Sequence, residues 1–192
     1  MRLTDAKIKD LLSKFFPILE TNEINYFLSI CEYDVAKNKE IILKRGRIDN
    51  MLLIILRGSA RGYQISEDGK ELTNHIRSEG FLFGDPLVFT NQKQPLDVEA
   101  IGELHYLKFD VHLLEQLAMD NNKLMQFYLD LLKEIIVTFS RRINSFVAMT
   151  PSDRYKDLID WNPKYLQSTF DKHIASFLGV TPITIHRIKK SK

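Results

Sequence analysis

The chain has 192 residues, of which 44% are hydrophobic, and a formal net charge of only +2. This length suits one large domain, or a medium domain joined to a small one. No segment approaches the run of about 18 apolar residues that a membrane span needs, and the start lacks the apolar core of a signal peptide. We therefore expect a cytoplasmic protein with no membrane partner. The single cysteine, Cys31, excludes a disulfide framework within one chain.

Charge is unevenly distributed along the chain. Residues 151–192 hold eight Lys or Arg against four Asp or Glu, whereas the preceding 150 residues hold 19 against 21. A basic end on a near-neutral body favours contact with a polyanion. A solvated basic tail would have the same balance, so charge alone does not decide between the two interpretations.

The first 119 residues are expected to form two short helices and then a series of short strands. Apolar residues at helical spacing predict helices over about 4–15 and 22–30. The run Met51–Leu56 is six apolar residues long, as in a strand buried on both faces. Together with Met51–Leu56, a strand from about residue 33 and further strands are predicted over 40–44, 59–65, 70–77, 97–101 and 103–109. Seven or eight short strands separated by glycine turns indicate a β-barrel or sandwich.

A long amphipathic helix is predicted from Asp120 to Met149. One apolar stripe comprises Met125, Leu129, Leu132, Ile136, Phe139, Ile143 and Phe146. A second stripe comprises Leu124, Tyr128, Leu131 and Ile135. A helix with two apolar faces needs two partners, so we expect one face to pack on its own domain and the other on a second copy of the chain. The second stripe is the predicted dimer interface.

Residues 171–190 have the pattern of two helices joined by a tight turn. Gly179 can adopt the left-handed conformation that ends a helix. Thr181 can cap the next helix, and Pro182 suits its first position. Ile185 and Ile188 are then expected to face the core.

The outward positions and the helix starts of this unit are the predicted DNA contacts. They are Lys172, Thr181, Ile183, Thr184, Arg187, Lys189 and Lys190. Arg187 is the main candidate for a base or phosphate contact, because arginine can address guanine bidentately. Lys172 and Thr181, near the helix starts, are better placed for phosphates.

The order of these elements resembles the Crp/Fnr family of bacterial transcription regulators. The motif at 40–46 (EIILKRG) agrees with the family's barrel, and 80–85 (GFLFGD) is similar to the phosphate-cassette loop of cyclic-nucleotide domains. Residues 151–155 and 174–187 resemble the DNA-binding half. The resemblance implies an α+β protein with three parts. These are a sensor domain at 1–119, made of a jelly-roll barrel with N-terminal helices, a long dimerisation helix at 120–150, and a helix-turn-helix domain at 151–192.

The resemblance implies a dimeric regulator that binds double-stranded DNA, with RNA polymerase as a candidate partner and a small-molecule effector of unknown identity. The degenerate ligand pocket would comprise Gly84, Asp85, Leu96 and Asp97. Nucleotide-binding members have Glu where Asp85 stands, and an Arg near the position of Leu96 or Asp97. A cyclic phosphate would be buried here without a charge partner, which costs several kcal/mol, so we do not expect cyclic AMP to bind. No cofactor is expected.

The main alternative is a ligand-binding regulatory module whose helical C-terminal part contacts a protein. Pro182 and Ile183, where polar base-reading residues often sit, favour this alternative, as does the lack of the β-wing common in the family. An enzyme is not supported, because nothing resembles a catalytic constellation. The five histidines show no metal-ligand spacing, so no metal site is expected. His173 and His186 are expected to be surface residues.

Overall fold

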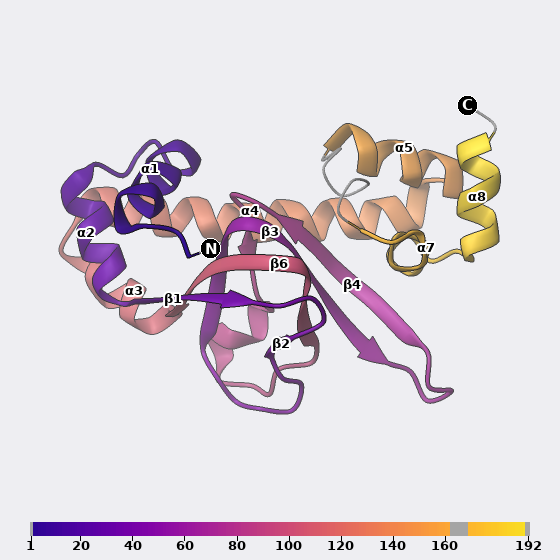
Figure 1. Ribbon diagram of the computed structural model, residues 1–192, viewed down its shortest axis with the longest axis horizontal. Helices are drawn as coiled ribbons and strands as arrows, with labels where there is room; N and C mark the ends of the chain where they lie inside the picture. The colour runs from indigo at the N-terminus through magenta and orange to yellow at the C-terminus, as the bar shows by residue number, and fades with distance from the viewer. Residues whose placement is uncertain (1, 162–168, 191–192) are drawn as a thin grey trace.

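The protein is built from a central antiparallel β-structure with helices at both of its ends (Figure 1). The structure, a computed structural model, describes residues 2–161 and 169–190. The predicted α+β order of a barrel, one long helix and small C-terminal helices is confirmed. Within the described ranges, every helix is too short or too polar to cross a bilayer.

The strands pair in the order β1-β6-β3-β4, with β2 added to β6 and β5 added to β3, and all pairs are antiparallel. The described strands are β1 (Cys31–Ala36), β2 (Ile41–Leu43), β3 (Met51–Ile65), β4 (Glu71–Ser78), β5 (Leu82–Phe83) and β6 (Asp97–Asp110). The expected breaks near Gly58 and Gly102 are wrong, because β3 and β6 run on through both glycines. Gly58 has φ 96° and Gly102 has φ 75°, values that favour glycine. At Gly58 the glycine accommodates a bulge, where the β3–β6 register shifts, rather than a turn.

The apolar run in β3 is buried on both faces, as predicted. Leu52, Ile54 and Leu56 face the helices and belong to the larger core. Leu53 and Ile55 face the barrel interior and belong to a second core. Alternate side chains of a strand point to opposite faces, so a strand between two cores must be apolar at every position.

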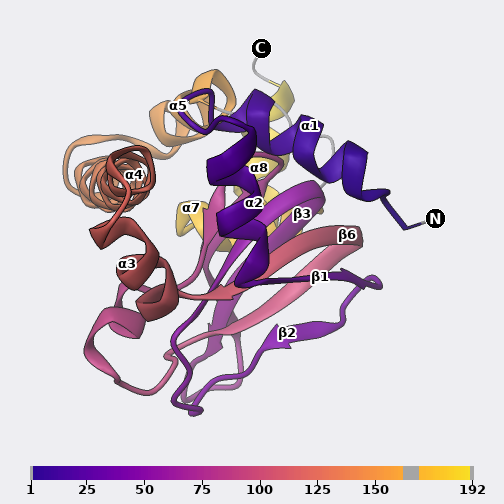
Figure 2. The same cartoon turned by 90° about the vertical axis from the view of Figure 1, so that its left-hand side faces the viewer.

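The N-terminal helices α1 (Asp5–Phe15) and α2 (Thr21–Ser29) cover the outer face of the barrel, close to where the predicted helices lie (Figure 2). A further helix, α3 (Val111–Met119), is absent from the sequence prediction, and a short 3-10 helix, η1 (Pro86–Thr90), follows β5. Asp110 caps α3, since its carboxylate accepts from the amide of His112 at 2.8 Å.

The long helix α4 (Asn122–Ala148) packs its predicted dimer stripe against its own chain, so that assignment is wrong. Leu124 is 1% exposed and Leu131 is 4% exposed. Tyr128 and Ile135 are partly buried against the same core, and Tyr128 donates a hydrogen bond to Glu115 of α3. The prediction lacks α3, and with it the apolar surface that α4 meets within its own chain.

The opposite face of α4 carries an exposed apolar stripe. Its exposed fractions are 41% at Leu129, 66% at Ile136, 63% at Ile143 and 81% at Val147. The first three residues recur every seven positions, which is the spacing of a helix seam rather than of a scattered surface. This face is the one on which α4 has no apolar partner among the described residues.

The C-terminal helices α5 (Pro151–Trp161), α7 (Asp171–Leu178) and α8 (Pro182–Lys190) form a small unit at the far end of α4 (Figure 1). Their shared core includes Ile174, Leu178 and Ile185, and also Ile76 of β4. The unit therefore packs directly on the barrel. Asn162-Pro163, a pair of residues that typically interrupts a helix, lies outside the described residues.

Candidate nucleic-acid interface and ligand pocket

Helices α7 and α8 are joined by a tight turn of the kind that the sequence predicts. Gly179 ends α7 with φ 66°, in the left-handed region. The hydroxyl of Thr181 accepts from the amide of Thr184 at 3.2 Å and so caps α8. Ile185 and Ile188 are buried against α5 and α7. These contacts orient α8 with one face inward and one face toward solvent.

The outward face of α8 is basic. Arg187, Lys189 and Lys190 are all exposed in its last turns, and Ile183 near its start is 67% exposed. Thr184 is half-buried beneath them, whereas Lys172 at the start of α7 is exposed. The seven predicted contact residues therefore lie on one compact unit.

One of these cations already has an anionic neighbour. The ammonium of Lys189 lies 2.5 Å from the carboxylate of Asp171, at the start of α7. Among the residues that the structure describes, Arg187 and Lys190 have no such ion pair. A phosphate would compete with Asp171 for Lys189, but would meet Arg187 and Lys190 directly.

His173 is not a surface residue, contrary to prediction, because it is only 7% exposed. Burial, together with the nearby charges of Arg61 and Lys172, lowers the pKa of His173 to about 4. The imidazole is therefore neutral near pH 7. His186, on α8, is exposed as predicted.

Hydrogen bonds connect α7 to the edge of the barrel. The hydroxyl of Ser176 donates to the carbonyl of Glu71 at 3.0 Å and accepts from the amide of Thr73 at 2.9 Å. One serine of α7 therefore satisfies two backbone groups of β4. This contact, with Ile76 in the shared core, ties the basic unit to the barrel.

The four predicted pocket residues do not form an open anion site. Asp85 caps η1, because its carboxylate accepts from the amide of Leu87 at 3.0 Å, and burial raises the pKa of Asp85. Leu96 is 2% exposed. Its methyl group would lie 3.2 Å from a Cβ placed on Gly62, so it fills the space next to that strand.

The other two pocket residues also have structural roles. Asp97 begins β6 and accepts from the amide of Arg45 at 2.9 Å. A Cβ on Gly84 would lie 2.2 Å from a methyl group of Leu52, so the backbone there packs directly on the core. Both carboxylates of the predicted pocket thus accept hydrogen bonds from backbone amides, that of Asp85 locally and that of Asp97 from a distant part of the sequence.

A small cavity beside Gly84 is lined by β4, β5 and α4, and Glu134 is the acid that faces it. The carboxylate of Glu134 accepts from the amide of Leu82 at 3.4 Å. Burial raises the pKa of Glu134, and the nearby charge of Arg77 opposes that shift. The sequence pattern does not single out Glu134, because an acid in a long amphipathic helix looks like any solvated charge.

Comparison with known proteins agrees with this fold. Residues 34–121 match the family model described as the cyclic nucleotide-binding domain. No curated protein has significant similarity to the chain.

Three solved structures illustrate the structural likeness. FixK2 from Bradyrhizobium japonicum is 14% identical with a TM-score of 0.71, and the match covers 84% of each chain. CLP from Xanthomonas campestris, described as a c-di-GMP-responsive global regulator, is 14% identical with a TM-score of 0.68, covering 90% of this chain and 91% of CLP. A putative transcriptional regulator of the Crp/Fnr family from Eubacterium rectale is 16% identical with a TM-score of 0.64, covering 93% of this chain and 87% of its own. At identities this low, the structural likeness establishes a shared fold alone.

Proposed function

We propose that the chain is a dimeric, DNA-binding transcriptional regulator whose barrel is a sensor domain. The observation that carries this proposal is the basic, outward face of α8. The helix is oriented by burial of its opposite face and by the capped turn that precedes it. In this proposal α8 enters the major groove, which has room for one helix. Arg187 contacts a base or phosphate, and Lys189, Lys190, Lys172 and Thr181 contact phosphates. Ile183 and Thr184 meet a thymine methyl group or a base edge.

The proposed dimer forms through the exposed stripe of α4 that contains Leu129, Ile136, Ile143 and Val147. The exposure of all four side chains and the seven-residue spacing of the first three support a seam between two parallel copies of α4. A two-fold dimer would present two copies of α8 to successive major grooves about 34 Å apart. An effector or partner that changes the setting of the α4 pair would change that distance and hence DNA affinity. RNA polymerase is the protein partner that such a regulator would contact.

The proposed sensor does not take cyclic AMP. Support comes from three residues at or beside the predicted pocket. Leu96 is a buried apolar side chain, Asp85 uses its carboxylate to cap η1, and Glu134 is an acid that lines the cavity beside Gly84. Two of the neighbours named above, CLP and the Eubacterium rectale protein, are described as regulators, and CLP is described as responsive to c-di-GMP, which agrees with a sensor of different specificity.

A salt titration of DNA binding tests the regulator proposal. If Arg187 contacts a base, Arg187→Ala should weaken binding to a selected DNA site by about 1–3 kcal/mol of binding free energy and relax the base preference at one position of that site. Lys190→Ala should weaken binding to all sequences and flatten the slope of log affinity against log salt by roughly one unit for each phosphate that a subunit no longer neutralises. Lys189→Ala should have a smaller effect, since Asp171 already neutralises that cation.

Lys93→Ala is the matched control, because Lys93 is an exposed lysine in a barrel loop away from α8. It should leave both the affinity and the salt slope unchanged. Equal and weak binding by all these proteins to selected and unrelated DNA would reject the regulator.

The second candidate is a regulatory module that contacts a protein through its C-terminal unit. The observation in its favour is the exposure of two large apolar residues there, with Phe170 59% exposed and Ile183 67% exposed. For this candidate Ile183→Asp would abolish partner capture, whereas the lysine variants would behave like wild type on DNA.

A further inference from the structure

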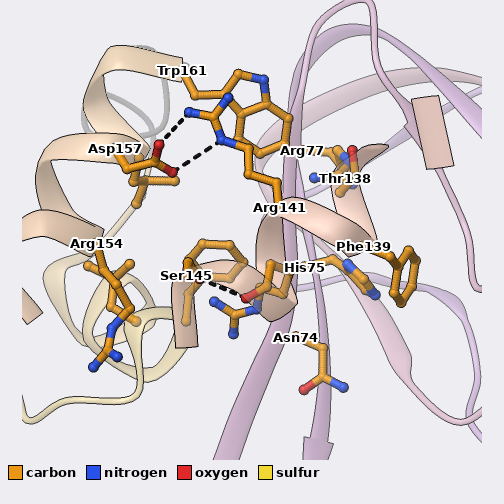
Figure 3. Close-up of a pocket in the computed structure, with 14 residues that line it drawn as sticks. Asn74, His75, Arg77, Thr138, Phe139, Arg141, Ser145, Arg154, Asp157 and Trp161 are labelled. Atoms are coloured by element: carbon orange, nitrogen blue, oxygen red, sulfur yellow. Dashed lines mark hydrogen bonds and ion pairs between the residues drawn. The ribbon is translucent and has the colours of Figure 1, made fainter. Parts of the chain in front are cut away.

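A crevice where the barrel, α4 and the C-terminal helices meet concentrates arginine side chains (Figure 3). It is lined by β4, α4, α5 and α7, has a cavity volume of about 30 Å³ and is open to solvent at its mouth. Among the residues that the structure describes, four arginines line it: Arg77, Arg141, Arg142 and Arg154. Within the same residues the lining includes one acid, Asp157, and one histidine, His75, which is neutral because burial lowers its pKa to about 3.

Asp157, the acid that lines the crevice, already has an arginine partner. Arg141 makes two hydrogen bonds to Asp157, at 2.5 and 3.2 Å, and its guanidinium lies 5.0 Å from the centre of the Trp161 ring. Figure 3 shows Arg141 between Asp157 and Trp161. Arg77 lies 5.7 Å from the same ring and, together with Glu134, lines the cavity beside Gly84. These two arginines therefore have partners that fix their positions.

The other two arginines have no carboxylate partner among the described residues. Within residues 2–161 and 169–190, Nη1 of Arg142 and Nε of Arg154 are buried and make no hydrogen bond. The Arg142 guanidinium lies 3.8 Å from the centre of the Phe177 ring and 4.4 Å from that of Phe146, and Arg154 lies 5.0 Å from the Phe146 ring. Two cations thus share one aromatic neighbour. Burial and the charge of Arg154 lower the pKa of Arg142 to about 10.

Two buried guanidinium donors without a protein acceptor among the described residues, and the repulsion between Arg142 and Arg154, are both unfavourable. An anion would relieve both penalties at once. A phosphate group suits the arrangement better than a carboxylate, because it carries nearly two charges and at least three acceptor oxygens, enough for two guanidiniums. We propose that the crevice binds a phosphate group through Arg142 and Arg154, either as free phosphate or as the phosphate of a small metabolite whose remainder stays at the mouth.

The location gives such a ligand a structural consequence. Phe146, the ring shared by Arg142 and Arg154, also packs on the turn between α7 and α8, where a Cβ on Gly179 would lie 2.7 Å from its Cε1 atom. Arg142 belongs to α4, Arg154 to α5 and Phe177 to α7. A phosphate held there would bridge α4 and α5 beside that turn. His75, Arg77 and Phe139 line both this crevice and the cavity next to Gly84, whereas Arg142 and Arg154 line the crevice and not that cavity. The proposal does not depend on DNA binding.

The test is calorimetric titration of the full chain with inorganic phosphate and with AMP, at an ionic strength held constant with sodium chloride. Wild type should bind at least one of them with a submillimolar dissociation constant. Arg142→Gln and Arg154→Gln should each weaken that binding about 10- to 100-fold, the range for one charge-assisted hydrogen-bonding partner. Arg45→Gln removes the same charge from an exposed barrel position and should change the constant less than twofold.

The two ligands distinguish the sources of the phosphate. Equal affinity for phosphate and AMP indicates free phosphate, whereas tighter AMP binding that still depends on Arg154 indicates a phosphorylated metabolite. Circular dichroism checks that each variant folds, and if Arg142→Gln does not, Arg154→Gln decides. Binding of neither ligand by folded wild type, or unchanged binding in the folded variants, overturns the proposal. Because no DNA is present, this result is independent of the salt titration above.

Discussion

Charging the exposed stripe of α4 should separate the proposed dimer without unfolding the chain. The change is Ile136→Glu together with Ile143→Glu, at side chains that are 66% and 63% exposed in the single chain. Burying a whole isoleucine side chain is worth about 1.5–3 kcal/mol, so the two-thirds still exposed is worth about 1–2 kcal/mol. A dimer would bury four such side chains, so the substitutions should remove about 4–8 kcal/mol of dimerisation free energy. The dissociation constant of the dimer should therefore rise at least ~1000-fold.

Sedimentation velocity over a concentration series measures the effect. The matched control is Ile48→Glu with Ile65→Glu, two exposed isoleucines of the barrel at 62% and 46% exposure, which should leave the dimer intact. The same charges at Leu131 and Ile135 should instead lower thermal stability, because those residues pack in the core of their own chain. A double variant at positions 136 and 143 that stays dimeric, or a wild type that is monomeric throughout, would refute the reasoning.

Two further predictions concern the barrel. Cyclic AMP and cyclic GMP should bind no tighter than millimolar, a binding free energy near −4 kcal/mol. The reason is that the predicted pocket positions hold two aspartates, Asp85 and Asp97, and the buried Leu96 in place of a cation. Micromolar binding by calorimetry would contradict this. His75 should make the free energy of unfolding fall as the pH is lowered. Its pKa is about 3 in the folded chain, below the ordinary value of 6.5, so between pH 3 and pH 6.5 the unfolded chain binds a proton at this side chain that the folded chain does not. Its contribution is complete above about pH 6.5 and declines by about 1.4 kcal/mol per pH unit below it. Urea unfolding of His75→Gln at pH 7.5 and 5 should show a shallower loss than wild type, and an equal loss would remove His75 as the cause.

Local pattern was sufficient for much of the fold. The six apolar residues from Met51 to Leu56 indicate burial on both faces, because side chains alternate along a strand, and both faces are buried. The turn between α7 and α8 was predictable from Gly179, Thr181 and Pro182, since each residue type satisfies a backbone requirement within its own few residues. Exposure of Arg187 and burial of Ile185 follow from helical period once that turn is placed.

Glycine in a strand was harder to interpret. Gly58 and Gly102 have positive φ, which is equally compatible with a turn and with an irregular residue in a continuous strand. Pairing with the neighbouring strand decides between them, and that neighbour is distant in sequence: β3 pairs with β6 on both sides of Gly58. No local signal carries that information.

Partner choice was decided only by the tertiary structure. Helical period identified two apolar stripes on α4, but either could have faced the barrel, and the one containing Leu124 and Leu131 is buried because α3 and the N-terminal helices pack there. The arginine crevice is a stronger case, since Arg77 lies far from Arg142 and Arg154 in the sequence and each looks like an ordinary surface charge. Sequence period reports which residues share a face of one element, whereas burial and charge environment depend on which elements meet, and that is set by packing over the whole chain.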